Sequence, residues 1–402
     1  MTNNKLQWKD ILIKWADKNC IPELTTRNGE SIGIARNAEA LIAQTELNLS
    51  HIKLDYLPFE ICYMQNLELI NIEFCGVKKL PNSIGSLGKL SSLLCGYNRL
   101  RKLPRSIGKL KNLEILELQN NYLSYLPRLA GKLVSLKKLC LYANNIKILS
   151  SIESGYGNLE FLDCSMNNLT TFPEISKLGN LEELRLGMNK IEEIPDFIDE
   201  LHNLKVLVMQ GNMISKFPSS MRLLTKLEAL YLSQNNLETM PDWICSLPKL
   251  STFCMSSTPL PNNFEKMSLA ELYVYETNIE VLPKLKNHLK LKYLNLTRTK
   301  ISEIPYWLEG AKNLESLAIQ QNEVKKLPSW IGNFDKLSTL FLDEKAIERL
   351  PESISNINLT KNLAIRCPNL VLSNMQISWI EELKQANNDI FIQVECKNFT
   401  YE

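Results

Sequence analysis

Residues 113–127 read LEILELQNNYLSYLP, and the same spacing of leucines returns along most of the chain. It returns as LKKLCLYANNIKILS from Leu136, LEELRLGMNKIEEIP from Leu181 and LEALYLSQNNLETMP from Leu227. These stretches define a repeat LxxLxLxxNxLxxLPxxIxxLxx of about 23 residues. A fixed period of this length indicates a protein built from stacked repeats, so the chain length of 402 residues does not translate into a number of globular domains.

The first leucine of the repeat can be followed through most of the sequence. It stands at Leu67, Leu90, Leu113, Leu136, Leu159, Leu181, Leu204, Leu227, Leu250, Leu269, Leu291, Leu314 and Leu337. A degenerate repeat precedes these around Leu47 and Leu49, and a remnant follows around Leu363 and Ile365. We count about 14 repeats, which occupy residues 46–357.

The repeat predicts a short strand followed by a turn and an irregular segment. In LxL the two leucines face the core and the residues between them face outward. One repeat cannot bury its own apolar face, so neighbouring repeats stack into a parallel sheet. The asparagine after each strand can bond backbone groups of adjacent turns. This expected ladder comprises Asn98, Asn121, Asn144, Asn167, Asn189, Asn212 and Asn235, and it resumes at Asn322.

These residues resemble the leucine-rich repeat family, in its bacterial type with 23-residue repeats and LP and IGxL segments. The resemblance extends over about four-fifths of the chain. It implies an α/β fold: a curved solenoid with a parallel sheet on the concave side and irregular or single-turn helical segments on the convex side. It also implies non-catalytic binding of a protein through the concave face.

The two ends predict caps that close the core of the solenoid. Residues 1–45 are expected to form a helical hairpin, with helices over residues 5–19 and 31–44. The string WADKNCIPEL from Trp15, Arg36 and LNLS from Leu47 are similar to the N-terminal caps of bacterial repeat proteins, some of which are effectors injected into eukaryotic cells. Residues 358–402 are expected to form a terminal half-repeat, a helix over residues 377–387 and a strand over residues 390–395.

One region departs from the pattern. Thr258, Thr277 and Thr299 replace the ladder asparagine in three successive repeats. The repeat from Leu250 has 19 residues and the repeat from Leu269 has 22. Shortened convex segments predict a change in local curvature, while neutral drift is the competing explanation, because threonine can also form hydrogen bonds at this position.

Outward strand positions define the expected binding surface. Tyr273, Tyr275 and Tyr293 fall in adjacent repeats of the irregular region, and strands about 4.8 Å apart would let their rings form one patch. Phe161, Val206, Val208 and Tyr231 form a looser second patch, interrupted by Glu183 and Arg185. Tyr142, Glu271 and Phe341 complete the expected partner-binding set. The alternative is that tyrosine is simply a favourable strand residue.

A basic segment is a second candidate surface. Nine basic residues and no acidic ones stand between Phe74 and Leu113. The central members of this basic patch are Lys78, Lys79, Arg99, Arg101, Lys102 and Arg105. Several occupy matching repeat positions, so they should stack along one edge. They could contact an acidic protein or, weakly, an anionic membrane, while a solvated face is the simpler explanation. Nucleic acid is not expected.

Composition and motifs give no support for an enzyme. The net charge is +2, and 10 cysteines and 3 histidines are scattered singly. Single cysteines suit a reducing compartment and predict no disulfides. Phosphate-binding, metalloprotease and nucleophile-elbow strings are absent from the sequence, so no catalytic residue, metal or cofactor is expected. Cys396 is the one conceivable nucleophile. Cys95 and Cys164 should be buried, and Cys140 and Cys254 should be exposed thiols.

The sequence therefore predicts a monomeric protein-binding solenoid that binds a host protein as a secreted bacterial effector. About 50 residues follow Pro351, too few for the ubiquitin-ligase domain that some bacterial repeat effectors carry. An enzyme or ligase-type effector and a resident cytoplasmic or membrane-associated scaffold remain as alternatives. The sequence shows neither a signal peptide nor a transmembrane segment, so we expect a cytoplasmic protein or one exported to the host cytosol by a non-Sec route.

Overall fold

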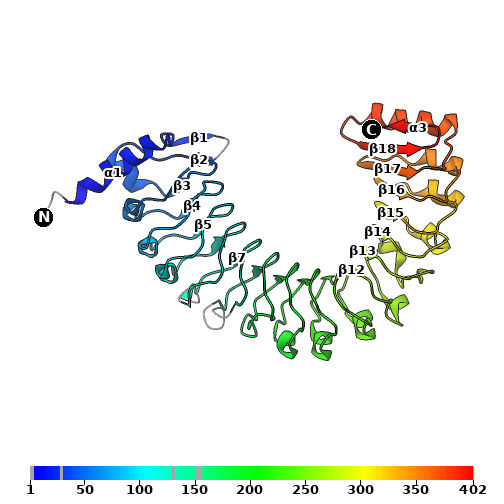
Figure 1. Ribbon diagram of the computed structural model, residues 1–402, viewed down its shortest axis with the longest axis horizontal. Coiled ribbons are helices and arrows are strands. Elements are labelled where there is room, and N and C mark those ends of the chain that lie inside the picture. The colour runs from blue at the N-terminus through cyan, green and yellow to red at the C-terminus, as the bar shows by residue number, and fades with distance from the viewer. Residues whose placement is uncertain (1–3, 28–29, 129–131, 150–155, 402) are drawn as a thin grey trace. The chain divides into compact units, whose positions relative to one another are not determined.

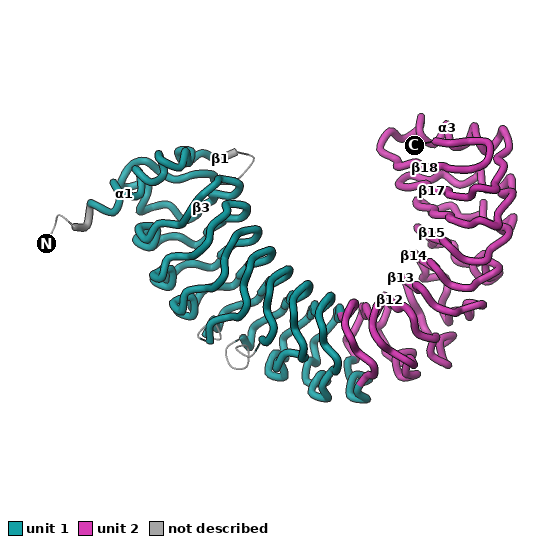
Figure 2. Tube along the Cα trace, viewed as in Figure 1, with its two compact units in different colours: residues 1–208, 218–224 teal, residues 209–217, 225–402 magenta. Residues whose placement is uncertain are grey.

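Stacked repeats form two compact parts in a computed structural model of the protein, which describes residues 4–27, 30–128, 132–149 and 156–401. Unit 1 comprises Met1–Val208 and Pro218–Leu224, and unit 2 comprises Met209–Phe217 and Thr225–Glu402 (Figure 2). In each unit the strands follow one another side by side, and loops and helical turns form the other side of each repeat (Figure 1).

The N-terminal cap is more varied than a helical hairpin. Helix α1 (Asn4–Lys18) agrees with the sequence prediction and buries Leu12, Trp15 and Ala16. It is followed by the antiparallel strands β1 (Thr25–Arg27) and β2 (Glu30–Ile32) and by the short helix α2 (Ala38–Ala43). The predicted helix over residues 31–44 is therefore wrong for its first half.

Gly33 explains why a helix cannot begin at residue 31. Its φ angle is +100°, and a Cβ atom there would lie 2.4 Å from the carbonyl oxygen of Pro22. The chain passes so close to Pro22 that only glycine fits, and a positive φ interrupts a right-handed helix. The helix starts only after Asn37, whose side chain accepts a hydrogen bond from the backbone N–H of Ala40 at 2.8 Å.

Unit 1 contains a parallel sheet of short strands. These strands are β3 (Glu46–Asn48), β4 (Leu69–Asn71), β5 (Ser92–Leu94), β6 (Ile115–Glu117), β7 (Lys138–Cys140), β8 (Phe161–Asp163), β9 (Glu183–Arg185) and β10 (Val206–Val208). Each residue pairs with its counterpart in the next repeat, as Leu93 pairs with Leu116. The repeat leucines are buried, so the core runs as a column through the stacked repeats.

Unit 2 continues the same architecture with longer strands. These strands are β11 (Ala229–Tyr231), β12 (Thr252–Ser256), β13 (Glu271–Tyr275), β14 (Tyr293–Thr297), β15 (Ser316–Gln320), β16 (Thr339–Asp343), β17 (Asn362–Cys367) and β18 (Phe391–Cys396). They lengthen from three residues to five at β12, the first repeat in which threonine replaces the ladder asparagine. A short last strand, β19 (Thr400–Tyr401), pairs antiparallel with β18.

The buried asparagines form the ladder that the sequence predicts. The side chain of Asn121 donates to the carbonyl oxygens of Cys95 at 2.9 Å and Leu118 at 3.1 Å, and it accepts from the N–H of Leu100 at 2.8 Å. One amide therefore satisfies backbone groups of two adjacent repeats. Thr258 replaces part of this role, because its hydroxyl is 3.2 Å from the carbonyl oxygens of Leu237 and Ser256.

The side of each repeat opposite the strand consists mainly of single 3₁₀ turns, most of which begin after a proline. In unit 1 they are Phe59–Tyr63, Ile84–Ser86, Arg105–Lys109, Asp196–Glu200 and Ser219–Leu223. In unit 2 they are Asp242–Ser246, Phe264–Lys266, His288–Lys290, Tyr306–Gly310, Ser329–Asn333 and Glu352–Asn356. The proline stands at the N-cap, where its carbonyl oxygen accepts the first hydrogen bond of the turn, as that of Pro104 does from the N–H of Ile107 at 3.1 Å.

The C-terminal cap closes the core of unit 2 with helix α3 (Asn374–Ala386). Ser373 and Gln376 form a reciprocal capping box at its start. The indole of Trp379 is buried and donates to the carbonyl oxygen of Ile357 at 2.9 Å. The C-terminal helix and strand predicted from the sequence are both present. Among the described residues, no helix combines the length and the apolarity that crossing a membrane requires.

Candidate protein-binding surfaces

A groove on the strand face of unit 2 is a candidate site, because tyrosines predicted as contact residues line it. It has a volume of about 670 Å³. Its lining includes Tyr231, Cys254, Ser256, Tyr273 and Tyr275. In the register of the sheet, Cys254 lies between Tyr231 and Tyr273, and Ser256 lies beside Tyr275. Strand β12 thus provides a floor of small side chains between two strands that carry tyrosines.

Two of the tyrosines form a stacked wall. The ring centroids of Tyr273 and Tyr275 are 6.4 Å apart, with an interplanar angle of 26°. The hydroxyl of Tyr273 donates to Glu271 at 3.2 Å. Burial and the neighbouring Glu271 raise the pKa of Tyr273, and burial raises the pKa of Tyr275 to about 12. Both phenols therefore stay neutral near pH 7, where they offer an apolar ring and a hydroxyl that can donate or accept.

The rim of the groove comes from the turns after the strands. It includes Gln234, Glu276, Arg298 and Gln321, which all have positive φ angles between 51° and 58°. Arg298 links two neighbouring turns, since it pairs with Glu276 at 2.7 Å and donates to the side chain of Gln321 at 2.7 Å. Both partners of this ion pair are exposed, so it orders the rim more than it stabilises the fold.

Tyr293 lies outside this groove. Its Cα pairs with that of Glu271, whereas Tyr273 pairs with Asn295. The hydroxyl of Tyr293 donates to Glu315 at 3.1 Å, and this hydrogen bond is the main cause of its raised pKa. The structure thus brings Tyr231, Tyr273 and Tyr275 together and places Tyr293 farther along the sheet, so the expected contact of its ring with Tyr273 and Tyr275 is not formed.

The exposure of Cys254 also differs from the sequence prediction. The sequence predicts an exposed thiol, but the residue is 6% exposed. Its sulfur lies 3.1 Å from the hydroxyl of Ser233, and larger tyrosines flank it on both neighbouring strands. Cys140 is half-buried, whereas Cys95 and Cys164 are buried as expected.

The looser second patch is divided between the two units. Phe161, Val206 and Val208 lie on the sheet of unit 1, and Tyr231 lies in the groove of unit 2. The ring of Phe161 is contacted by two cations, with the Lys138 Nζ and the Arg185 Cζ each 5.6 Å from its centroid. These cations occupy the ring that was expected to receive a partner.

The remaining expected contact residues lie beside these surfaces. The hydroxyl of Tyr142, in unit 1, lies 2.8 Å from the sulfur of Met166. Phe341, on unit 2, lies between Ala318 and Ala364 in the register of the sheet. Both side chains are half-buried. The lining of the groove includes Asp343, two residues beyond Phe341, but does not include Phe341 itself.

The basic patch of unit 1 is exposed along one edge of adjacent repeats. Lys78, Lys79, Arg99, Arg101, Lys102 and Arg105 are all exposed. Within the described parts of the chain, none of these six forms an ion pair. Tyr56 and Tyr125 occupy the repeat position of Lys79 and Lys102, and both are exposed. The patch is therefore an uncompensated positive surface bordered by tyrosines.

A stack of rings continues along the same edge. His51 stacks on Phe74 with centroids 4.7 Å apart, and Phe74 stacks on Tyr97 at 4.1 Å. All three have positive φ angles, between 55° and 63°, because the turn after each strand requires this conformation in nearly every repeat. Bulky residues rarely adopt it, so ring stacking offsets part of its cost.

Cys396, the one conceivable nucleophile, is half-buried and hydrogen-bonded in the structure. All ten cysteines are free thiols. Burial raises the pKa of Cys396, and its sulfur donates to the carbonyl oxygen of Phe399 at 3.0 Å. A raised pKa disfavours the thiolate that a nucleophile needs. Over the residues that are described, no group of three His, Cys, Asp or Glu side chains is arranged to hold a metal ion.

Sequence reasoning missed the polar half of the groove. Arg298, Gln320, Gln321 and Arg366 line it, but none of the four was among the predicted contact residues. For Arg298 and Gln321 the signal was present in the repeat, because the residue directly before each ladder position lies in the turn after the strand. In unit 1 the same slot carries the stacked rings of His51, Phe74 and Tyr97.

Comparisons with protein families support the repeat assignment. A family model described as "Leucine-rich repeat region" matches residues 274–388. Two further models, "Leucine Rich repeats (2 copies)" and "Leucine Rich Repeat", match residues 157–199 and 226–247. A human PH domain leucine-rich repeat-containing protein phosphatase 1 is 33% identical over 72 residues, which are 17% of this chain and 4% of that protein. The match is thus confined to a small fraction of the phosphatase.

Solved structures share the fold over most of the chain. A leucine-rich-repeat protein of Leptospira interrogans is 28% identical, covers 89% of this chain and 97% of its own, and superposes with a TM-score of 0.70. An internalin of Listeria monocytogenes is 20% identical with a TM-score of 0.61, covering 97% and 95% of the two chains. The plant peptide hormone receptor RGFR1 in complex with RGF2 is 25% identical, with a TM-score of 0.54, over 82% of this chain and 62% of the receptor chain.

The periodic leucines, the asparagine ladder, the parallel strands and these similarities all lead to the same assignment. The chain belongs to the leucine-rich repeat family, in its bacterial type, and has that family's protein-interaction fold.

Proposed function

We propose that this protein is a non-catalytic binding module whose main contact surface is the groove lined by Tyr231, Tyr273 and Tyr275. The observation that carries the proposal is the shape and chemistry of this groove: a floor of small side chains, a stacked tyrosine wall and a polar rim. Tyrosine supplies a large contact area with little loss of side-chain freedom, and it is enriched at binding hot spots.

The groove favours a protein segment as its occupant. Its rim carries Glu276 and Asp343 together with Arg298 and Arg366, so charges of both signs are available to a polypeptide. The similar plant receptor is described as a peptide hormone receptor in complex with RGF2, which shows that this fold can present a peptide-binding surface. Glu271 accepts a hydrogen bond from the hydroxyl of Tyr273 and would thereby hold that ring in place.

The partner we propose is a protein of a eukaryotic host, so that the molecule acts as a bacterial effector. The similarity to a Leptospira interrogans protein supports a bacterial origin, and ten free thiols suit a reducing compartment such as the cytosol. A ligase-type effector and a resident bacterial scaffold are the competing roles.

Affinity capture tests this proposal. The baits are the wild type, Tyr273→Ala/Tyr275→Ala and the control Tyr122→Ala/Tyr125→Ala, which removes two exposed tyrosines of unit 1. Circular dichroism confirms that each bait is folded. We expect a host protein that is retained by the wild type and the control and is lost with the groove variant. Retention by all three baits would rule out the groove as the contact surface, and a partner found only in bacterial lysate would favour the resident scaffold.

A second candidate function is contact with an anionic membrane through the basic patch. It is favoured by six exposed cations without ion pairs and by the bordering tyrosines. Sedimentation with phosphatidylserine vesicles should then fall when Arg101→Glu/Lys102→Glu is introduced and should weaken at high salt. Equal sedimentation of wild type and variant would exclude this role.

A further inference from the structure

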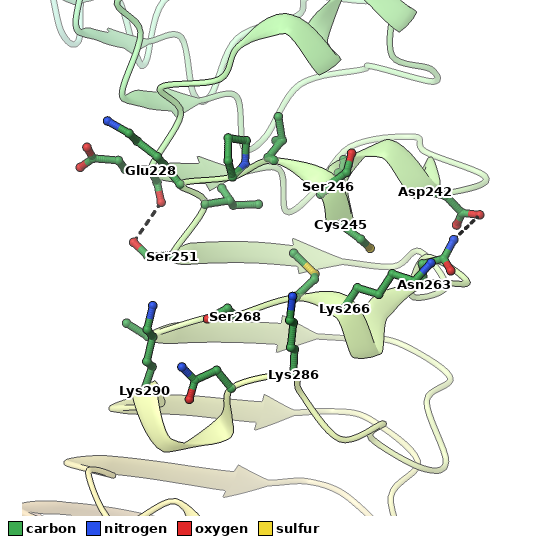
Figure 3. A pocket seen from close by; sticks show the side chains of 18 residues that line it. Glu228, Asp242, Cys245, Ser246, Ser251, Asn263, Lys266, Ser268, Lys286 and Lys290 are labelled. Atoms are coloured by element: carbon green, nitrogen blue, oxygen red, sulfur yellow. Dashed lines mark hydrogen bonds between the residues drawn. The ribbon is translucent and has the colours of Figure 1, made fainter.

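A second hollow lies on the side of unit 2, away from the groove. Figure 3 shows it between Cys245 and Ser246 on one side and Lys286 and Lys290 on the other. Its volume is about 840 Å³. We call it the notch.

The notch originates from the shortened repeat. In the preceding repeat, Pro248 and Lys249 make a turn between the apolar residues Leu247 and Leu250. In the 19-residue repeat, only Ser268 separates Met267 from Leu269, so this turn is one residue shorter. The missing volume opens the edge of the stack beside Ala270.

The shortened turn uncovers part of the apolar core. Leu247 and Leu250 are 7% and 6% exposed, whereas their counterparts Leu201 and Leu204 are fully buried. Together with Met267 they line the notch. A small apolar floor at the bottom of an open hollow favours a ligand with an apolar side chain.

The edge of the stack changes its chemistry at the same place. In six repeats an asparagine at the turn donates to the carbonyl of the preceding turn, as Asn180 does to Gly157 at 2.8 Å and Asn313 does to Leu289 at 2.8 Å. Elsewhere this asparagine is replaced only singly, by Lys89, Ser135 and Lys336. Four successive repeats replace this asparagine. The replacements are Lys226, Lys249, Ser268 and Lys290.

Positive charge therefore surrounds the apolar floor. Lys249, Lys266, Lys286 and Lys290 line the notch, against two carboxylates, Glu228 and Asp242. Asp242 is already engaged, since it accepts hydrogen bonds from the N–H of Asn262 at 2.8 Å and the side chain of Asn263 at 3.2 Å. Within the described residues, the four lysines form no ion pair.

We propose that the notch binds an acidic peptide segment of a protein partner, with one apolar side chain seated on Leu247, Leu250 and Met267 and its carboxylates held by the four lysines. The segment would take the place of the missing turn residue, because the regular repeats place a two-residue turn here, such as Lys111–Asn112 or His202–Asn203. The lysines favour acidic residues on both sides of the anchor in the peptide, because the charges are complementary. The small apolar floor has room for one apolar side chain of the peptide.

The occupant is a polypeptide rather than a lipid for a geometric reason. The notch is a hollow in the side of the stack, flanked by the 3₁₀ turns of neighbouring repeats (Figure 3), and the apolar side chains of Leu247, Leu250 and Met267 in its lining are more than nine-tenths buried. A protruding peptide side chain reaches such a floor, whereas a flat membrane surface would meet the lysines alone. A lipid is therefore an outcome that the test must exclude.

The test uses the full chain and a short fluorescent peptide in which one leucine is flanked by glutamates on both sides. Fluorescence anisotropy measures its affinity for the wild type, for Lys249→Glu/Lys290→Glu and for Lys89→Glu/Lys336→Glu. The last variant is a matched control, because it reverses two turn lysines outside the notch and changes the net charge equally. Alkylation of the half-buried Cys245, followed by mass spectrometry, reports where the peptide sits, with the exposed Cys20 as the reference thiol.

We expect saturable binding that weakens at least about tenfold in the notch variant and stays within about twofold in the control. Bound peptide should slow alkylation of Cys245 and leave Cys20 unchanged. Replacing the leucine of the peptide by serine should also weaken binding. The proposal is overturned by equal binding to both lysine variants, by protection of Cys20 alone, or by binding of phosphatidylserine vesicles without binding of the peptide. The groove variant Tyr273→Ala/Tyr275→Ala should bind the peptide normally, so the two sites are tested separately.

Discussion

Tyr273 and Tyr275 stand two residues apart on β13, and their rings stack with centroids 6.4 Å apart on the same face of the sheet. Alternate residues of a strand share a face, so a pair with this spacing forms a continuous wall. The neighbouring strand β12 offers only Cys254 and Ser256 opposite that wall. The contrast in side-chain size between two adjacent strands creates the groove.

The asparagine ladder should contribute measurably to the stability of unit 1. Asn121→Ala removes the group that satisfies Leu100, Cys95 and Leu118, so it leaves buried backbone groups without partners. We expect a loss of about 2–4 kcal/mol in the free energy of unfolding. Urea denaturation measures it. Asn112→Ala is the control, because its exposed side chain makes one hydrogen bond, to Gly88, and its loss should cost less than about 1 kcal/mol.

Where threonine replaces the ladder asparagine, removing the side-chain polar group should have a different effect on the free energy of unfolding. The hydroxyl of Thr277 is buried and has no hydrogen-bond partner among the described residues. Thr277→Val keeps the shape and removes an unsatisfied polar atom, so the free energy of unfolding should stay equal or rise by up to about 1 kcal/mol. Thr258→Val removes a hydroxyl that donates and should be destabilising by about 1 kcal/mol. Thermal unfolding of the two variants measures both changes in stability. A larger loss of stability for Thr277→Val than for Thr258→Val would contradict this prediction.

Glu344 should make stability depend on pH. Its side chain is 1% exposed, and burial raises its pKa from 4.5 to about 7, even though it accepts a hydrogen bond from the N–H of Asn322 at 2.8 Å. The folded protein therefore holds this proton more tightly than the unfolded chain does. The stabilising contribution is complete below pH 4.5 and is lost as the pH rises to about 7.

The variant Glu344→Gln tests this dependence. It retains an oxygen that can accept from Asn322 and cannot ionise. Between pH 4.5 and 7 the unfolding free energy of the wild type should fall relative to that of the variant by roughly 1–3 kcal/mol. Urea denaturation across this range measures the difference. Parallel curves for the two proteins would show that Glu344 does not carry the effect.

Cys396 should be dispensable for function. The pKa of its thiol is raised by burial, and the sulfur is engaged with Phe399. Cys396→Ser should therefore bind the captured partner with unchanged affinity and cause no change in the covalent state of that partner. Intact-mass spectrometry of the mixture checks the second point. A modification of the partner that disappears in the variant would reinstate the enzyme alternative.

The repeat pattern predicted the regular parts of the fold because each leucine position recurs in the same environment. It did not predict the strands β1 and β2, because their formation depends on Gly33 passing against Pro22, a contact without periodicity. Local propensity favoured a longer helix there, and the tertiary packing overrode it.

The candidate groove was only partly predictable for a related reason. Outward strand positions identified Tyr231, Tyr273 and Tyr275, but the register of neighbouring strands decides which of them meet. Tyr293 and Glu271 both stand two residues after the first leucine of their repeats, so the regular register places Tyr293 opposite Glu271. The notch was visible in the sequence only as a missing turn residue before Leu269, and its lysines became a group once the turns were stacked.

The central claim is tested most directly by the affinity of the captured partner for the groove variant. Isothermal titration calorimetry with purified partner compares the wild type, Tyr273→Ala/Tyr275→Ala and Tyr122→Ala/Tyr125→Ala. We predict that the groove variant binds at least about 30-fold more weakly, which corresponds to a hot-spot loss of about 2 kcal/mol, and that the control binds as the wild type does. Equal affinities for all three proteins would contradict the account.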